Sequence, residues 1–261
     1  MSLSAEAVSF NTNRATLLNR VSITVASGEL VALLGANGAG KSTLLRVLSA
    51  ELRPTGGRVS LDGRDLKSFR PLELAKRRAV LPQDSALEFP FSALEVALMG
   101  CAPHVRTSET PHDYRIARAA LHSTNASAFE TRSYPSLSGG ERQRVQLARV
   151  MAQIWERGPA SRFLLLDEPT SSLDVQHQHD TLRVAQRLAG EGVGVLAILH
   201  DLNLTALYAD RVVILQRGEV LACGSPQALL EPKLIHEAFG LNVAVIPHPT
   251  LPRPLIVAIP S

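Results

Sequence analysis

The chain has 261 residues, of which 45% are hydrophobic and 20% are charged, and its formal net charge is +3. This length and composition are typical of one large globular domain with an ample core, and they exclude a disordered chain and a small fold that depends on disulfides. No apolar stretch approaches the roughly 18 residues of a membrane-spanning helix, and the basic residues are spread along the chain rather than gathered in a block typical of nucleic-acid binding.

The first twenty residues contain a polar run, Asn11-Thr12-Asn13-Arg14, where a secretory signal would need continuous apolar residues. We therefore expect the protein to stay in the cytosol. The two cysteines, Cys101 and Cys223, have no metal-ligand spacing. Both are predicted to be packing residues in a reducing compartment.

The first predicted buried strand, Leu30–Leu34, leads directly into a glycine-rich loop, Gly35-Ala36-Asn37-Gly38-Ala39-Gly40-Lys41-Ser42. A short run without polar residues suits a strand that is covered on both faces. In a loop of this pattern, backbone N–H groups close around the α- and β-phosphates, Lys41 neutralises the β- and γ-oxygens, and Ser42 offers its hydroxyl to Mg²⁺. A helix predicted over residues 42–50 adds a favourable dipole. The loop therefore predicts nucleotide binding.

Residues 58–64 are predicted to form a hairpin with Gly63 at its turn. A short apolar run then ends in Leu81-Pro82-Gln83, where Gln83 could reach the metal and the attacking water. A lone glutamine is otherwise a surface residue. The insert that follows is predicted to be mostly helical, with a loop over residues 107–111 and Leu147, Met151 and Ile154 on one helical stripe.

The insert contains a second predicted anion-binding element, Leu137-Ser138-Gly139-Gly140-Glu141. Its glycines permit close approach of the backbone to a phosphate, and a helix beginning near Gly140 directs its N-terminus there. The alternative is a simple helix cap, because Ser138 and Glu141 have the capping-box spacing, and both interpretations can hold together. Since no phosphate loop lies nearby in sequence, we expect the phosphate to come from another copy of the chain.

Two more predicted buried strands, residues 163–166 and 193–199, end in polar residues. Asp167 is placed to hold Mg²⁺ and Glu168 to act on the attacking water as a general base, whereas the alternative is that the pair caps the next helix. His200 could sense the γ-phosphate or be an ordinary structural histidine. The carboxyl ends of parallel strands share one edge of a sheet, so these residues and the phosphate loop are predicted to form one site.

The last part of the chain carries fewer chemical signals. A hairpin is predicted over residues 212–220, and the proline-rich residues 247–261 are expected to be extended or irregular. His177 and His179 lie two residues apart, so on a helix they face different sides and are not expected to share a metal. Trp155 is predicted to be a buried anchor beneath a loop.

In this order, the motifs resemble those of the nucleotide-binding subunit of ATP-binding-cassette transporters over essentially the whole chain. The match adds the loop Ser171-Ser172-Leu173-Asp174 to the elements above. The resemblance implies an α/β P-loop cassette in which residues 1–83 and 153–240 form a RecA-like core of mixed sheet with an antiparallel β-subdomain. Residues 84–152 would form a helical subdomain that carries the signature motif, and residues 241–261 a C-terminal extension.

The resemblance also implies a role for each matched residue. Glu168, His200 and Gln83 would be catalytic, while Ser42, Gln83 and Asp167 would hold Mg²⁺. Phe10 falls where the family places an aromatic ring, usually tyrosine, against adenine, and the alternative for it is ordinary packing. The residues that would contact ATP are Phe10, Gly35, Asn37, Gly38, Gly40, Lys41, Ser42, Thr43, Ser138, Gly139, Gly140 and Asp174.

The family further implies a head-to-tail homodimer in which the phosphate loop of one copy and the Ser138 turn of the other enclose each ATP. Closure on ATP would drive two transmembrane permease subunits from the cytoplasmic face of the bacterial inner membrane. A periplasmic substrate-binding protein would act indirectly, and nucleic acid is not expected as a partner.

A finer resemblance, to one group of importers, predicts the transported cargo. Phe89-Pro90-Phe91-Ser92, Met99-Gly100 and Ala102-Pro103-His104 resemble importers of iron chelates, vitamin B12 and heme, and residues 153–159 with Pro247-His248-Pro249 resemble the heme subgroup most. Ferric siderophores and cobalamin stay open as alternatives. A DNA-repair or translation ATPase is the alternative from another class, although sustained heptads for its coiled coils and a second cassette are absent from the sequence.

Overall fold

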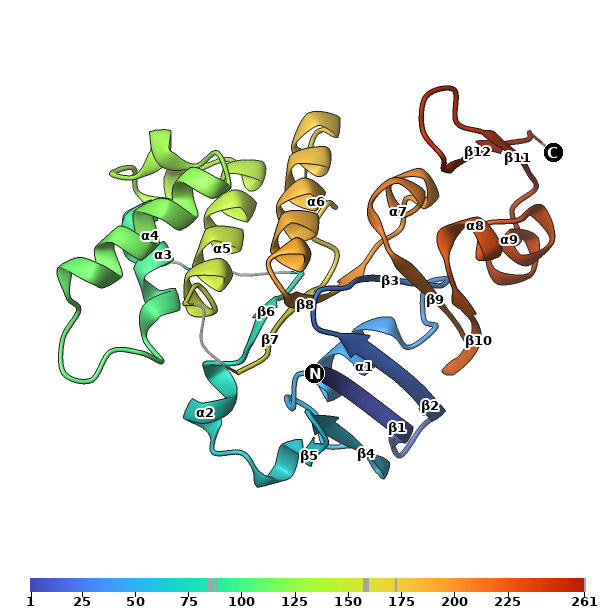
Figure 1. Cartoon of the computed structure of the whole chain (residues 1–261), viewed down its shortest axis with the longest axis horizontal. Coiled ribbons are helices and arrows are strands. Elements are labelled where there is room, and N and C mark those ends of the chain that lie inside the picture. Colours follow the sequence, from blue (N-terminus) through green and yellow to red (C-terminus); the bar gives the residue numbers. More distant parts are fainter. Residues whose placement is uncertain (84–86, 88, 157–159, 172, 261) are drawn as a thin grey trace.

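The computed structural model describes residues 1–83, 87, 89–156, 160–171 and 173–260, and its strands form sheets of six, four and two strands (Figure 1). The two larger sheets lie on opposite sides of helix α1 (Lys41–Leu48), and a group of helices stands at one end of the molecule. This arrangement confirms the expected α/β cassette with a mixed sheet and a separate antiparallel sheet. Within the described residues, none of the helices is both long enough and apolar enough to cross a bilayer.

The six-stranded sheet forms the centre of the molecule. Its strands are parallel except for the edge strand β10, which pairs antiparallel with its neighbour β9. Each apolar run that predicts a buried strand is confirmed, and every residue of β3, β7 and β8 is buried. In spatial order the strands are β10 (Glu219–Gly224), β9 (Arg211–Gln216), β3 (Leu30–Leu34), β8 (Val193–Ile198), β7 (Arg162–Leu166) and β6 (Arg78–Leu81).

The four-stranded antiparallel sheet covers the other side of α1. Its order is β2 (Thr16–Ala26), β1 (Ser2–Asn11), β4 (Gly56–Leu61) and β5 (Arg64–Asp65). Buried and exposed residues alternate along much of β2, as expected for a sheet with one face in water. The buried face and α1 share one apolar cluster with alternate residues of β3, so α1 is held between the two sheets. The hairpin predicted over residues 58–64 is the β4–β5 pair.

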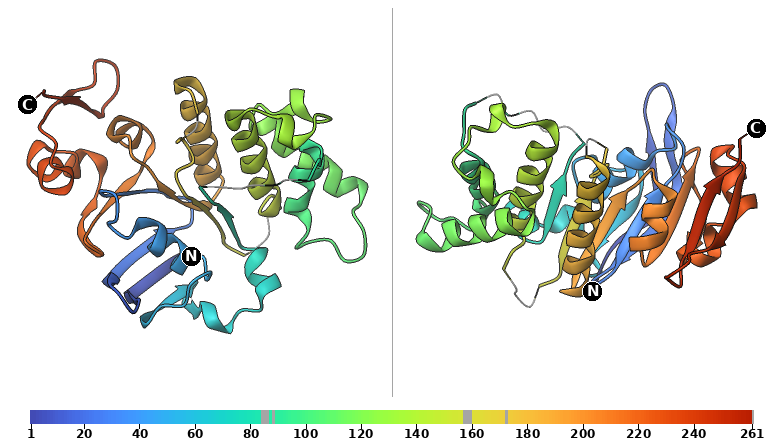
Figure 2. Two further views of the ribbon diagram at one scale, coloured as in Figure 1. Left: turned by 180° about the vertical axis from the view of Figure 1, so that it is seen from behind. Right: turned by 90° about the horizontal axis from the view of Figure 1, so that it is seen from above.

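The helical insert contains α3 (Ala93–Leu98), α4 (Pro111–Ser123) and α5 (Gly139–Gln153), joined by loops and short 3-10 turns. Each of these helices begins with a capping box, which fixes its first residue by reciprocal hydrogen bonds. Leu147, Met151 and Ile154 are buried in the cluster that joins the insert to the central sheet, as the sequence stripe predicts. Figure 2 shows the insert beside α6 (Val175–Gly190), at the end of the molecule away from both chain termini.

The remaining elements complete the two faces of the central sheet. The short helix α2 precedes β6, α7 follows β8, and α8 and α9 follow β10. Their bounds are Pro71–Ala75 for α2, Leu202–Tyr208 for α7, Pro226–Leu229 for α8 and Pro232–Phe239 for α9. The hairpin predicted over residues 212–220 is the β9–β10 pair.

The C-terminal tail is partly regular. β11 (Val243–Pro247) and β12 (Pro254–Ala258) form an antiparallel hairpin. Pro247 and Pro254 form the last pair at the turn end of this hairpin. The N–H group that each proline lacks is therefore not needed to continue the ladder of hydrogen bonds between the strands. Asn203 of α7 bonds both backbone groups of Ile256, at 3.0 and 2.8 Å, and so ties the hairpin to the core. Residues 254–258 are extended and residues 248–253 are irregular, so the prediction of an extended or irregular tail is confirmed.

The two cysteines differ in their surroundings. Cys101 is buried in the helical insert, as predicted, whereas Cys223 is exposed. Cys223 lies on β10, the edge strand of the central sheet, so one of its sides meets solvent instead of another strand. The prediction that Cys223 is a packing residue is therefore wrong.

Candidate nucleotide site

The phosphate loop is a tight turn that requires glycine at its ends. Gly35 has φ of 148°, and a Cβ atom there would lie 2.3 Å from the carbonyl oxygen of Leu215. Gly40 has φ of 101°, and its Cβ would lie 2.6 Å from the carbonyl oxygen of Leu17. Any side chain at either position would combine a strained backbone with a clash. The loop thus presents α1 with its N-terminus open to an anion.

Lys41 is held over this loop by the loop itself. Its ammonium donates to the carbonyl oxygens of Gly35, at 2.8 Å, and Ala36, at 3.1 Å. The residue is only 6% exposed. Burial lowers the pKa of Lys41, and the negative charges of Glu168 and Asp167 oppose that change. A desolvated cation that is fixed beside backbone N–H groups is suited to the oxygens of a phosphate chain.

Ser42 and Asp167 form the second part of the site. The Ser42 hydroxyl donates to Asp167 Oδ1 at 3.3 Å, across 125 positions of sequence. Burial raises the pKa of Asp167, whereas the hydrogen bond from Ser42 acts to lower it. Both groups offer oxygen ligands, and Mg²⁺ in nucleotide sites takes one or two such protein ligands together with phosphate oxygens and water. The pair therefore fits the predicted magnesium role.

Glu168 stands at the centre of the third part. Its Oε1 lies 2.7 Å from His200 Nε2, and its Oε2 accepts a hydrogen bond of 3.0 Å from Gln83 Nε2. These three residues follow β7, β8 and β6, so the predicted convergence of strand ends is confirmed. Glu168 has φ of 50°, an unfavourable left-handed conformation for glutamate that persists only where the surrounding structure enforces it.

The alternative in which Asp167 and Glu168 cap the next helix is not what the structure shows. Asp174 is the N-cap of α6 and accepts a hydrogen bond of 3.0 Å from the backbone of His177. Asp174 thus has a structural role beside the nucleotide role that the resemblance implies. Ser172, in the same loop, lies outside the described residues.

One open cavity of about 580 Å³ joins these parts. Its size is within the range of small-molecule sites. The cavity is lined by Leu17, Asn37, Gly38, Ala39, Gly40, Lys41, Ser42, Thr43, Gln83, Glu168 and His200. Most of the residues predicted to contact ATP or to catalyse are therefore brought together, and the sequence patterns missed only Leu17 and Ala39 among these lining residues.

Phe10 does not line this cavity. It is half buried on β1, opposite Leu18, and packs against the apolar cluster beneath the antiparallel sheet. Leu17, on the neighbouring strand, is the apolar residue that lines the cavity. The position of Phe10 is what ordinary packing would give, and its contact with adenine stays a prediction.

The Ser138 turn lies apart from the cavity, at the start of α5. Ser138 accepts a hydrogen bond from the Glu141 backbone at 3.3 Å, and Glu141 accepts one from the Ser138 backbone at 2.7 Å. This confirms the capping box. Ser138 and Gly139 are exposed, and none of the turn's residues lines the phosphate-loop cavity. A single copy of the chain therefore does not bring the two predicted anion-binding elements together.

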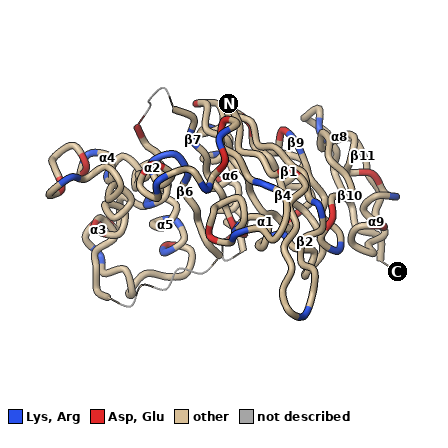
Figure 3. Tube along the Cα trace, turned by 90° about the horizontal axis from the view of Figure 1, so that it is seen from below, with Lys and Arg blue, Asp and Glu red and all other residues tan. Residues whose placement is uncertain are grey.

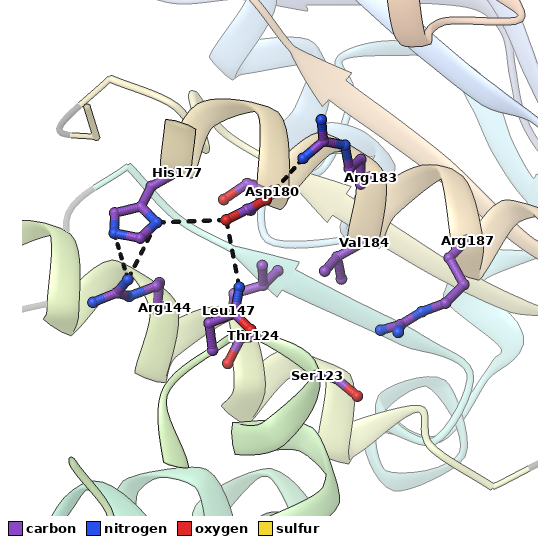
Figure 4. A pocket seen from close by; sticks show the side chains of 11 residues that line it. Ser123, Thr124, Arg144, Leu147, His177, Asp180, Arg183, Val184 and Arg187 are labelled. Atoms are coloured by element: carbon purple, nitrogen blue, oxygen red, sulfur yellow. Dashed lines mark hydrogen bonds and ion pairs between the residues drawn. The ribbon is translucent and has the colours of Figure 1, made fainter. Parts of the chain in front are cut away.

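A second cavity, of about 220 Å³, lies between α4, α5 and α6 (Figure 4). There Arg144 of α5 lies 2.6 Å from His177 Nε2, and Asp180 bonds Arg183 at 3.0 Å. His179 instead pairs with the hydroxyl of Tyr208 at 2.8 Å. His177 and His179 thus have separate partners, and His177 joins the helical insert to the core.

Comparison with known proteins identifies the family. Residues 18–171 match the family model described as ABC transporter, which is more than half of the chain. The chain belongs to the ABC transporter family. It is an ATP-binding and ATP-hydrolysing cassette, as the sequence motifs predict.

Individual relatives agree with this assignment. A hemin import ATP-binding protein of Gloeobacter violaceus is 51% identical over 246 residues, which are 94% of this chain and 90% of the relative. A solved metal-chelate type ABC transporter in an inward-facing conformation matches with a TM-score of 0.82 and 27% identity, over 99% of this chain and 97% of that one. A dimeric ATP-binding cassette with ADP and phosphate matches with a TM-score of 0.74 and 26% identity, over 86% and 98%.

Proposed function

We propose that this chain is the ATP-hydrolysing subunit of a bacterial heme importer, bound as a homodimer to two permease subunits at the cytoplasmic face of the inner membrane. The observation that carries the hydrolytic role is the pair of contacts that Glu168 makes with Gln83 and His200, beside the phosphate loop. The relative from Gloeobacter violaceus, named for hemin import, supports the transport role.

Each residue of the cluster has a distinct task in hydrolysis. Mg²⁺, when held by Ser42 and Asp167, would neutralise charge on the phosphate oxygens. Glu168 accepts the proton of the attacking water or polarises it, and His200 orients Glu168 and contacts the γ-phosphate. Lys41 stabilises the negative charge that grows on the β- and γ-phosphate oxygens. The left-handed backbone at Glu168 fixes its carboxylate for this task.

Gln83 is placed to transmit the state of the site to the helical insert. It donates to Glu168 from a position between β6 and the insert. We propose that residues 1–83 and 153–240 move as the core, and that residues 84–152 rotate against it when Gln83 changes partner. Such rotation would carry the effect of ATP to a membrane subunit.

A second copy would complete each site. The Ser138 turn is exposed and does not line the cavity of its own chain, so its capped helix start is free to bind a phosphate held by another copy. The solved cassette with ADP and phosphate is described as dimeric, which supports this arrangement. Binding of ATP would then draw two copies together, and hydrolysis would release them.

The proposal is tested by reconstitution with the candidate permease in proteoliposomes. We expect hemin to accumulate only when ATP is supplied on the side of this subunit, and Glu168→Gln to abolish uptake while ATP still binds. Cobalamin and a ferric siderophore serve as competing cargoes. Uptake of cobalamin alone would overturn the cargo, whereas loss of all ATP hydrolysis in the unaltered complex would overturn the enzymatic assignment.

A further inference from the structure

A cavity distant from the phosphate loop lies where the antiparallel sheet, α1, α2 and β6 meet. Its volume is about 310 Å³, and most of its lining is apolar. The larger apolar side chains of the lining are Val47, Leu52, Val59, Leu66, Phe69 and Leu74. None of the described residues that line it also lines the nucleotide cavity. A concave apolar cavity of this size with a few polar groups is typical of a small-molecule site.

Arg78 is the unusual member of the lining. Its Nε atom is buried, and no ion pair or hydrogen bond of its guanidinium is found within the part of the chain that the structure describes. Glu51 supplies an opposing charge, but its carboxylate bonds Arg46 at 2.8 Å. A half-buried guanidinium whose Nε atom is buried without a partner among these residues is poorly solvated, and an anion would stabilise it.

The pKa of Arg78 agrees with its burial and its lack of a partner among the described residues. Burial lowers the pKa of Arg78 to about 10, although the charge of Glu51 opposes that change. The guanidinium therefore keeps its proton at neutral pH while it is poorly solvated. An anion in the cavity would favour the charged form and raise this pKa again.

The other charged groups of the lining favour an anion as well. Arg53 and Lys67 are exposed members of the lining, and Asp65 is its acid. Asp65 Oδ1 already accepts a hydrogen bond of 2.8 Å from the Lys67 backbone, as the cap of a 3-10 turn. Figure 3 shows further basic segments of the chain around α2 and β6. Positive charge thus exceeds negative charge at this cavity.

We propose that this cavity binds a small apolar molecule that carries one carboxylate. The carboxylate pairs with Arg78, and the apolar body lies against the walls provided by α1, β4 and α2. A carboxylate matches the planar fork of the guanidinium, and a single charge leaves the rest of the ligand free to fill the apolar space. This site is separate from ATP binding and from the transport role proposed above.

The test is calorimetric titration of the full chain with octanoate, in the presence of saturating Mg-ADP so that the phosphate loop is occupied. We expect saturable binding with a dissociation constant of about 1 mM or lower, as befits a ligand of this size. Octylamine, which has the same tail and the opposite charge, is expected not to bind. Absence of octanoate binding, or equal binding of octylamine, would overturn the proposal.

Two variants locate the binding. Arg78→Gln removes the charge and is expected to weaken octanoate binding at least about tenfold, as loss of a charged hydrogen bond does. Leu52→Trp keeps Arg78 but fills the cavity, and the same loss is expected. The matched control is Arg58→Gln. Arg58 lies on β4, pairs with Glu6 in solvent and does not line the cavity. Unchanged binding in both cavity variants would place octanoate elsewhere and refute the proposal.

Discussion

Glu168 shows how much of this protein's chemistry depends on one backbone position. β7 ends at Leu166, and the chain turns at Glu168, a left-handed residue two positions later. The carboxylate of Glu168 then has partners from two other strand ends, His200 and Gln83. The carboxylate thus lies beside the phosphate loop, where it can meet the attacking water molecule.

We expect Glu168→Gln to slow ATP hydrolysis by about 10²–10⁴-fold, the usual contribution of a general base, while ATP affinity stays within about twofold. The amide keeps the shape of the side chain but cannot accept a proton, and it has one acceptor oxygen where the carboxylate offers two, to Gln83 and His200. Phosphate release measures hydrolysis, and a fluorescent nucleotide titration measures affinity. Glu73→Gln is the matched control, because Glu73 is an exposed acid paired with Arg64. Turnover at the unaltered rate in Glu168→Gln would contradict the assignment.

At this scale the sequence predicts residues that follow buried strands and misses those that depend on tertiary placement. Asp167, Glu168 and His200 follow the ends of apolar runs, Lys41 closes the loop that follows another such run, and all four lie in or beside one cavity. No sequence pattern distinguishes Leu17, because apolar and polar residues alternate in any strand that has one buried face. Only the position of β2 over the phosphate loop makes it part of the lining.

Among the elements, a bidentate ion pair connects the antiparallel sheet to the central sheet. Arg211, at the start of β9, bonds both oxygens of Glu29, at 2.6 and 2.9 Å. Glu29 also accepts a hydrogen bond of 3.1 Å from the backbone of Ala26, at the end of β2. Bidentate pairs of this kind are the stronger ones, and both side chains are at most a quarter exposed. The pair holds the end of β2 beside the start of the central strands.

We expect Glu29→Gln to lower the free energy of unfolding by about 2 kcal/mol at pH 7, as loss of charged hydrogen bonds to a mostly buried group does. Chemical denaturation followed by circular dichroism measures it. The matched control is Glu219→Gln, an exposed acid on β10 whose partner is Asn19. A change no larger than that of the control would show that the pair contributes little.

The same pair gives a pH dependence. Burial alone would raise the pKa of Glu29, but the hydrogen bonds and charge of Arg211 and the Ala26 backbone outweigh burial and lower it. A carboxyl with a lowered folded-state pKa adds stability above its unfolded pKa, and that stability is lost as pH falls through the folded value. We therefore expect the difference between the unaltered chain and Glu29→Gln to shrink in denaturation curves below about pH 4. A difference that stays constant between pH 7 and pH 3 would contradict this cause.

Packing within the helical insert depends on Gly100. A Cβ atom at this position would lie 2.0 Å from the carbonyl oxygen of Arg149 on α5. We expect Gly100→Ala to lower the free energy of unfolding by about 1–3 kcal/mol or more, because the backbones must move apart. Gly190→Ala is the matched control: a Cβ there meets no atom within 4 Å, and alanine on α6 should raise stability by about 0.5–1 kcal/mol. Urea denaturation of both variants distinguishes them, and a neutral Gly100→Ala would refute the close approach.

Elements are predictable from sequence where burial alone defines them. β3, β7 and β8 consist almost entirely of apolar residues, so their existence and almost their bounds follow from the sequence. The β11–β12 hairpin is different, since its prolines disfavour strands and its stability comes from pairing and from Asn203 on α7. Such a non-local partner leaves no local pattern to detect.

At the scale of the whole molecule, the two anion-binding elements are divided between the core and the start of the insert. The phosphate loop opens into a cavity with Glu168 and His200, while the Ser138 turn faces outward from the beginning of α5. The sequence predicts both elements and their use in different copies. The distance between the phosphate loop of one copy and the Ser138 turn of another depends on how two copies pack together. No sequence pattern within one chain specifies that packing.

Mixed dimers test this division directly. In a head-to-tail pair, a copy with Lys41→Ala and a copy with Ser138→Arg place both defects in the same composite site, so the other site stays intact. When both changes are carried by one copy and the other copy is unaltered, each site has one defect. In a Glu168→Gln background, which prevents turnover, we expect about one trapped ATP in the first kind of dimer and none in the second. Size-exclusion chromatography with nucleotide quantification measures both, and equal trapping in the two kinds would exclude shared sites.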